Sequence, residues 1–89
     1  MNALIVDAIQ NRKRLSFTYH GEHREVDPYA YGRDRNGHDS LRAFQVNTGW
    51  RMFHLSDVQG LSVGEVSPSP VHSEYRRNDR HMTHIYAQV

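Results

Sequence analysis

Two short runs of alternating side chains flank a polar turn in the middle of this chain. The runs cover residues 40–46 and 50–55, and Asn47-Thr48-Gly49 lies between them. Successive side chains of a β-strand point to opposite faces, so alternation indicates a half-buried strand. Gly49 can adopt the positive φ that a tight turn needs. This stretch predicts an antiparallel hairpin, and the rest of the chain must fold around a β-sheet.

The segments on either side of the hairpin predict one helix and more short strands. Asn2 can cap a helix over the apolar stripe that follows it. Residues 15–19 alternate as a strand, and residues 23–27 return beside them after a turn. An Asn-Gly turn at residues 36–37 leads back into the hairpin, and residues 61–63 form a short closing strand. We therefore expect a mainly β fold of about five strands, a strongly bent sheet or barrel with the helix across one open end.

The composition changes after residue 64, and this change sets the expected domain boundary. Residues 1–64 form the domain, and residues 65–74 form a Pro- and Ser-rich connector that cannot hold a helix or a central strand. In residues 75–89 several side chains recur every three or four positions, which favours a short, docked C-terminal helix. The alternative is an edge strand through Ile85, Ala87 and Val89.

Arginine dominates the cations of this chain. Ten of the eleven basic residues are arginine, and Lys13 is the single lysine. Arginine binds phosphate and carboxylate through paired hydrogen bonds and stacks on aromatic rings. The formal net charge is only +1, so general attraction of the chain to nucleic acid is weak. The chain has no cysteine, no signal-peptide pattern and no apolar span, so we expect a cytoplasmic protein that does not enter a membrane.

Several of these segments together resemble the WYL domain family. They are the first helix with its basic end, the Arg-x-Val-x-Pro segment at residues 24–28, and the Arg-x-Phe-x-Leu-x-x-Val strand at residues 51–58. The resemblance covers residues 3–63. It implies an Sm-like or SH3-like β-barrel that binds a nucleotide-like or nucleic-acid anion through tyrosine and arginine. In bacteria this domain usually follows a DNA-binding helix-turn-helix in a transcriptional regulator.

The sequence departs from the family pattern in two places. The Trp-Tyr-Leu tripeptide that names the family falls near residues 40–42, which are Ser-Leu-Arg here. No helix-turn-helix precedes the first helix, so we expect a stand-alone WYL-like domain. Such a domain would serve as a sensor or as the partner of a transcriptional regulator.

Arginines from three different strands are the candidate ligand-binding residues. Guanidinium groups beside aromatic rings suit a phosphate with a stacked base. The expected site therefore joins three arginines to three rings: Arg24, Arg42, Arg51, Tyr19, Phe44 and Phe53. Arg24 and Arg51 match positions that the family uses, whereas Arg42 does not. The alternative is that these arginines pair with nearby carboxylates and brace the barrel.

No sequence motif points to catalysis or to a bound metal. The seven histidines include two His-x-x-His pairs, at residues 20–23 and 81–84, but neither has a third ligand at a readable spacing. A nucleophile elbow, a P-loop and a dinucleotide fingerprint are all absent from the sequence. We therefore expect that this protein is not an enzyme and holds neither a metal nor another cofactor.

Three functions fit these observations. The first is a non-enzymatic module that senses an anionic, nucleotide-like ligand. The second is a nucleic-acid-binding barrel without sensing, which would also use the C-terminal arginines Arg76, Arg77 and Arg80. The third is a protein-interaction or oligomerisation module, because the edges of an open sheet favour association into homo-oligomers.

Overall fold

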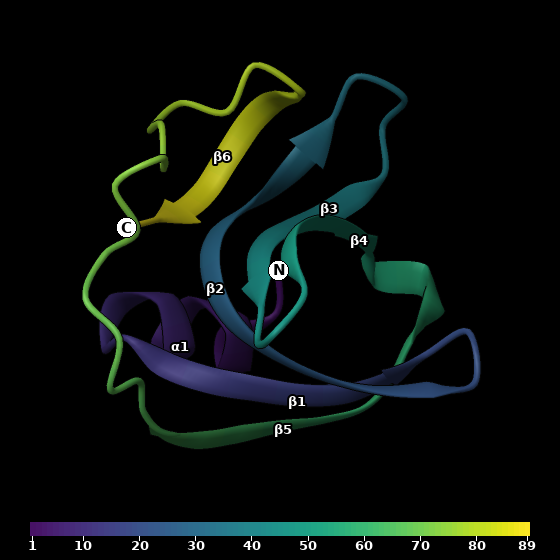
Figure 1. The fold of residues 1–89 in the computed structure, drawn as a ribbon. Helices are drawn as coiled ribbons and strands as arrows, with labels where there is room; N and C mark the ends of the chain where they lie inside the picture. Colours follow the sequence, from purple (N-terminus) through teal and green to yellow (C-terminus); the bar gives the residue numbers. More distant parts are fainter.

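One helix and a single bent antiparallel sheet make up the fold, and the computed structural model describes all of residues 1–89 (Figure 1). The helix α1 spans Ala3–Gln10, and a 3₁₀ turn, η1, spans Leu55–Asp57. The six strands are β1 Lys13–Tyr19, β2 Glu22–Asp34, β3 Asp39–Gln45, β4 Gly49–His54, β5 Val58–Val66 and β6 Met82–Gln88. The expected mainly β fold with an N-terminal helix is confirmed.

The helix α1 begins where the sequence predicts because Asn2 caps its free N–H groups. The Oδ1 atom of Asn2 accepts hydrogen bonds from the backbone N–H groups of Leu4 at 2.9 Å and Ile5 at 3.2 Å. Ile5, Ala8 and Ile9 form the buried face of the helix. With eight residues, α1 has neither the length nor the apolar run of a membrane-crossing helix, and the structure contains no other α-helix.

The core lies on the inner face of the sheet, against α1. Phe17 and Phe53 meet there edge-on, with ring centroids 5.0 Å apart. Burial of apolar surface is the main favourable contribution to folding, so this cluster holds α1 and the strands β1 to β4 together. Its ten members are Ile5, Ala8, Ile9, Leu15, Phe17, Val26, Tyr31, Leu41, Ala43 and Phe53.

The long strand β2 organises the sheet because it pairs with three other strands. One edge of β2 pairs with β3, and the other edge pairs first with β1, through residues 22–26, and then with β6, through residues 30–34. The strand order is β4-β3-β2-β1-β5, and β4 does not pair with β5. The sheet therefore curls on itself without closing into a barrel (Figure 1).

The C-terminal segment forms the strand β6, so the expected C-terminal helix is wrong and the edge-strand alternative is correct. The thirteen residues of β2 extend beyond the seven of β1, which leaves part of one β2 edge without a partner from β1. Buried backbone N–H and C=O groups without hydrogen-bond partners cost free energy, and β6 supplies these partners along the unpaired edge of β2. Gly32 of β2 allows the close approach, because a Cβ there would lie 2.2 Å from the carbonyl oxygen of His84.

Asp34 fixes the tight turn between β2 and β3. Its Oδ1 accepts hydrogen bonds from the backbone N–H groups of Asn36 and His38, both at 2.9 Å, and its Oδ2 accepts one from Ser40 Oγ at 3.0 Å. These bonds, that from His38 above all, hold the pKa of Asp34 below its ordinary value. The Asp34 carboxylate, at the end of β2, is therefore both charged and held in place.

Residues 67–81, which we call the C-terminal loop, connect β5 to β6 along the left-hand side of Figure 1. The loop contains no helix or strand, yet it is tied to the sheet at several points. The backbone N–H of Ser67 donates to the carbonyl of Arg12 at 2.7 Å, and the N–H of His72 donates to the hydroxyl of Tyr29 at 2.9 Å. These contacts hold the loop over the sheet, so that a space can form beneath it.

Candidate ligand-binding site

The register between β3 and β4 divides the expected site residues between the two faces of the sheet. Arg42 lies opposite Met52, and Ala43 lies opposite Arg51. Directly opposed residues in an antiparallel pair point to the same face, so Arg42 and Arg51 point to opposite faces. The expected convergence of Arg24, Arg42 and Arg51 on one pocket is therefore wrong.

The structure brings Tyr19, Arg24 and Phe53 together on the inner face. The guanidinium carbon of Arg24 lies 5.6 Å from the ring centroid of Tyr19 and 6.0 Å from that of Phe53. Its Nη1 donates to Gln45 Oε1 at 3.2 Å, and its Nη2 lies 3.4 Å from a carboxylate oxygen of Glu22. Arg24 is only 7% exposed, and its buried Nε has no hydrogen-bond partner.

Arg51 shares this face with Phe53 but lies in its exposed part. It forms no ion pair or hydrogen bond with another side chain of the protein, so its guanidinium group is open to solvent. Contact of Arg24 or Arg51 with a ligand stays a prediction.

Arg42 and Phe44 point to the outer face, where a pocket of about 470 Å³ opens between the sheet and the C-terminal loop. Arg42 and Trp50 form the wall from β3 and β4, and residues 74–81 form the wall from the loop. The volume lies within the range of roughly 300–1,000 Å³ that is typical of small-molecule sites. This pocket is the candidate functional site.

An ion pair between Arg42 and Asp79 fastens the loop across this pocket. The Nε of Arg42 donates to Asp79 Oδ2 at 2.7 Å, and the Asp79 side chain is 10% exposed. His81 Nδ1 lies 3.1 Å from the other Asp79 oxygen. Burial acts to raise the pKa of Asp79, but the hydrogen bonds from Arg42 and from the backbone N–H of His81 outweigh it, and the pKa is lowered.

The lowered pKa of Asp79 predicts an acid-sensitive attachment of the loop. Its contribution to stability is complete above the ordinary pKa of 3.8 and is lost as the pH falls through the lower pKa of the folded state. Asp79→Asn should therefore cost about 1.5–3 kcal/mol of unfolding free energy near neutral pH. The difference in unfolding free energy between this variant and wild type should shrink on acidification to about pH 2.5. Urea unfolding at each pH measures it.

The matched control is Glu65→Gln, which removes an exposed carboxylate without an ion-pair partner. It should leave the unfolding free energy unchanged at every pH. A difference between Asp79→Asn and wild type that stays constant down to about pH 2.5 would contradict the linkage.

Aromatic rings form the floor of the pocket. Trp50 lies edge-on to Phe44 and Tyr29, at centroid distances of 5.4 Å and 4.8 Å. Tyr75 of the loop stacks near-parallel to Trp50 at 6.2 Å, and its hydroxyl donates to the carbonyl of Tyr29 at 3.3 Å. Trp50 and Tyr75 are half-buried, so part of each ring remains open to the pocket. A planar ligand can therefore stack on this floor.

Comparison with known families identifies the domain that carries this pocket. The family model of the WYL domain matches residues 2–63. The chain belongs to the WYL domain family. Neither the comparison with curated proteins nor that with solved structures gives a match. WYL domains occur in regulators and are generally non-catalytic. In this WYL domain protein, Arg42 and Trp50 lie inside the matched residues, whereas the loop wall of the pocket lies beyond them.

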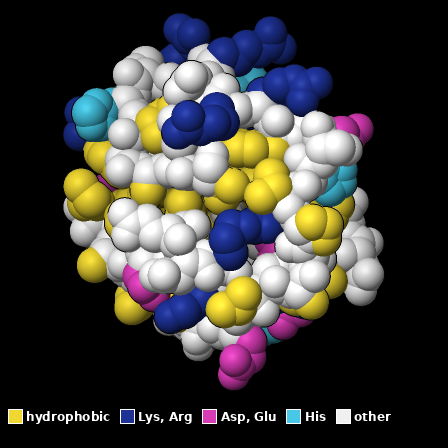
Figure 2. Space-filling model, turned by 90° about the vertical axis from the view of Figure 1, so that its left-hand side faces the viewer, with side chains coloured by type: hydrophobic (Ala, Val, Ile, Leu, Met, Phe, Trp, Pro, Cys, Tyr) yellow, Lys and Arg dark blue, Asp and Glu magenta, His cyan; other side chains and the backbone are white.

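The arginines of the loop pair with no Asp or Glu side chain in this WYL domain protein. Arg76 Nη1 donates only to the carbonyls of Ser73 and Tyr75, and Arg77 Nε donates to the carbonyl of Val89. Arg80 is exposed, and its guanidinium group forms no hydrogen bond. Figure 2 shows the side of the molecule along which the loop runs, with Lys and Arg side chains around a band of hydrophobic ones. The loop therefore offers cations that are free to bind an anion.

The expected site residues include only Arg42 among those that line this pocket. The sequence did contain a signal that the loop could bind an anion, because residues 76–80 hold three arginines directly after an aromatic residue. What the sequence did not show is that β6 would return to β2 and bring these arginines over Trp50. The pocket residues that the expected site lacks are Trp50, Glu74, Tyr75, Arg76, Arg77, Asn78, Asp79, Arg80 and His81.

Proposed function

We propose that this WYL domain protein is a non-enzymatic regulatory module that binds a small, nucleotide-like anion in the pocket beneath its C-terminal loop. The observation that carries the proposal is the composition of the pocket: loop arginines without Asp or Glu partners next to a stacked Trp–Tyr pair. Family membership supports a regulatory and ligand-sensing role.

The two chemical parts of the pocket suit the two parts of a nucleotide. Arg76, Arg77 and Arg80 supply forked N–H donors for phosphate oxygens. The rings of Trp50 and Tyr75 supply a stacking surface for a base, an interaction worth about 1–3 kcal/mol per base. Binding would fix the loop, and through it β6, against the sheet. A partner regulator that contacts this surface would then distinguish the ligand-bound state from the free state.

The first test is a calorimetric titration of the full chain with ATP and with a short oligonucleotide. Charge-assisted hydrogen bonds contribute about 1.5–3 kcal/mol, so Arg77→Ala should weaken binding roughly 10- to 150-fold. Trp50→Ala should weaken it to a similar extent through lost stacking. The matched control is Arg51→Ala, which removes one exposed arginine from the opposite face.

The outcome of this comparison decides where an anion binds. Unchanged affinity in Arg51→Ala together with weak binding in Arg77→Ala supports the outer pocket. A larger loss in Arg51→Ala would instead support a site on the inner face. Equal losses in both variants would mean general electrostatic attraction and would contradict a built pocket.

Direct nucleic-acid binding is the second candidate function, favoured by the three exposed arginines within residues 76–80. A protein that neutralises several phosphates shows a steep dependence of affinity on salt. A plot of the logarithm of the binding constant against the logarithm of the salt concentration has a slope of about −0.7 per phosphate on single strands. A slope of about −2 or steeper for the oligonucleotide, with no measurable binding of ATP, would favour this function over nucleotide sensing.

A further inference from the structure

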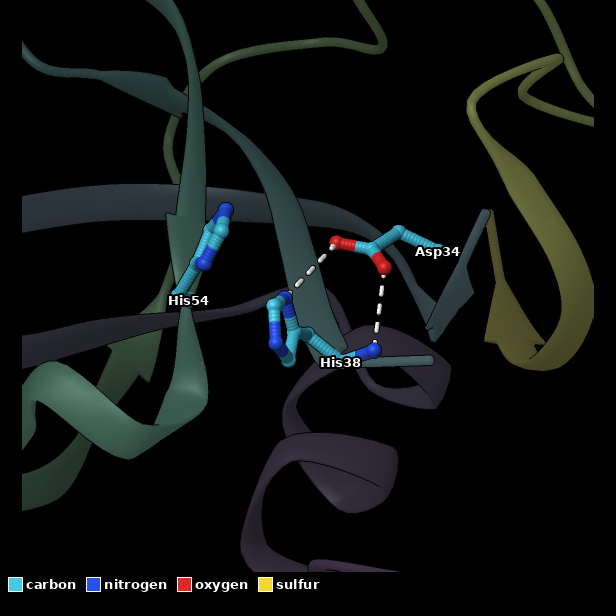
Figure 3. Close-up of side chains that lie close together, drawn as sticks. All are labelled: Asp34, His38 and His54. Atoms are coloured by element: carbon cyan, nitrogen blue, oxygen red, sulfur yellow. Dashed lines mark hydrogen bonds and ion pairs between the residues drawn. The ribbon is translucent and has the colours of Figure 1, made fainter. Parts of the chain in front are cut away.

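We propose that Asp34, His38 and His54 form a binding site for a divalent metal ion of the zinc class. The three residues come from the end of β2, the turn before β3 and the end of β4, and Figure 3 shows their side chains gathered in one place. One nitrogen from each histidine and one carboxylate oxygen of Asp34 all lie within 4.8 Å of one another. This cluster lies apart from the pocket beneath the C-terminal loop, and the two sites share no residue.

The donor set fits a borderline metal such as Zn²⁺. Two imidazoles and one carboxylate are ligands that zinc uses in sites with three protein ligands and a water molecule. In a tetrahedral site neighbouring donor atoms are about 3.3 Å apart, so the donors here must close by about 1.5 Å at most. The side chain of His38 is 58% exposed, so its ring can make this movement without disturbing the core.

The carboxylate is already oriented for such a site. Ser40 is fully buried, and its hydroxyl donates to Asp34 Oδ2 at 3.0 Å, while His38 Nδ1 lies 3.9 Å from the same oxygen. Metal-binding carboxylates in proteins are commonly held by such a hydrogen bond from a second residue. The turn itself accounts for the bonds to the Asp34 carboxylate, but it does not explain why the ring of His54 lies beside that of His38, at a centroid distance of 5.3 Å.

Solvent reaches the cluster through an open cavity of about 630 Å³ that His38 helps to line. A fourth, water ligand can enter from this side. Arg33 also lines the cavity and would repel a cation. The carboxylate of Asp39, which lines the same cavity, offsets the charge of Arg33. With neutral histidines, the three donors carry one negative charge, which favours a divalent ion.

A bound ion would join the β2–β3 turn to the end of β4, two segments that both adjoin β3. Binding to the folded state alone raises its stability, and a concentration of 100 times the Kd should raise the Tm by about 11–22 °C.

The test is a titration of the full chain with Co²⁺, followed by displacement with Zn²⁺. We expect one ion per chain and the visible absorption of cobalt in a tetrahedral N/O site. His38→Gln and His54→Gln should each weaken binding by about tenfold or more, and Ser40→Ala should weaken it by about tenfold through the lost hydrogen bond. The matched controls are His23→Gln and His84→Gln, exposed histidines outside the cluster, which should bind as wild type.

Two results would overturn the site. One is equal weakening by the control variants and the cluster variants, which means scattered surface binding. The other is the absence of saturable, one-to-one binding by the wild type. The Tm of each metal-free variant shows whether it folds, and His38→Gln, which changes an exposed turn residue, keeps the test valid if His54→Gln does not fold.

Discussion

Replacing Gly32 with alanine will push β6 away from β2 and open the pocket beneath the C-terminal loop. The added Cβ would lie 2.2 Å from the carbonyl oxygen of His84 and 3.0 Å from the Cα of Ile85. Both are backbone atoms of β6, so no side-chain rotation can relieve the clash. Overpacking of this kind costs roughly 3 kcal/mol or more, which should lower the Tm by about 10–20 °C.

Hydrogen exchange gives the local readout of this variant. In Gly32→Ala the amides of β6 should exchange fast, while those of β1 and β3 keep their protection in the remaining fold. The matched control is Gly64→Ala in β5, where an added Cβ meets its nearest atom, the carbonyl oxygen of Arg14, at an ordinary 3.6 Å. An unchanged Tm in Gly32→Ala would contradict the close pairing of β2 with β6.

Phe53→Ala should remove a large part of the stability of the domain. Phe53 is 1% exposed, and its ring meets those of Phe17 and Tyr19 edge-on, each at 5.0 Å. Truncation of a buried phenylalanine costs about 3–5 kcal/mol, because a cavity remains where the ring was. The total unfolding free energy of a small domain is only about 5–15 kcal/mol. Urea unfolding should therefore show a much lower midpoint for this variant, if it folds at all.

The matched control for Phe53→Ala is Phe44→Ala, the same change on the opposite face. Phe44 is half-buried and packs on Trp50 and His72, outside the core cluster. Its truncation should cost clearly less stability while it loosens the floor of the pocket. A cost as large as that of Phe53→Ala would mean that the outer face, and not the inner one, carries the core.

The fold could be predicted in large part because its local signals agree with its burial. Alternation in residues 15–19 and 40–46 gave strands whose inward residues, such as Phe17 and Leu41, are buried. The C-terminal segment was different, because the recurrence of Met82, Tyr86 and Val89 fits a helix as well as a strand. Its conformation is decided by the edge of β2 that β1 leaves unpaired, which no local pattern reveals.

The candidate site could not be predicted because it depends on register and on a distant contact. With Phe44 opposite Trp50, residues of equal parity share a face, so the even-numbered Arg42 and the odd-numbered Arg51 must separate. The length of the turn between the two strands sets this parity, and alternation within each strand does not. The ion pair between Arg42 and Asp79 joins residues 37 positions apart, and only the folded chain shows it.

The strands β1 and β6 share one edge of β2, and this arrangement affects how two molecules of this protein could associate. β6 follows a fifteen-residue loop, residues 67–81, and lies outside the residues that define the family domain. A strand on such a tether is interchangeable with the same strand of a neighbouring molecule, since both offer identical hydrogen bonds. Shortening the tether until β6 cannot reach back would favour reciprocal exchange, and two chains would then complete each other's sheets.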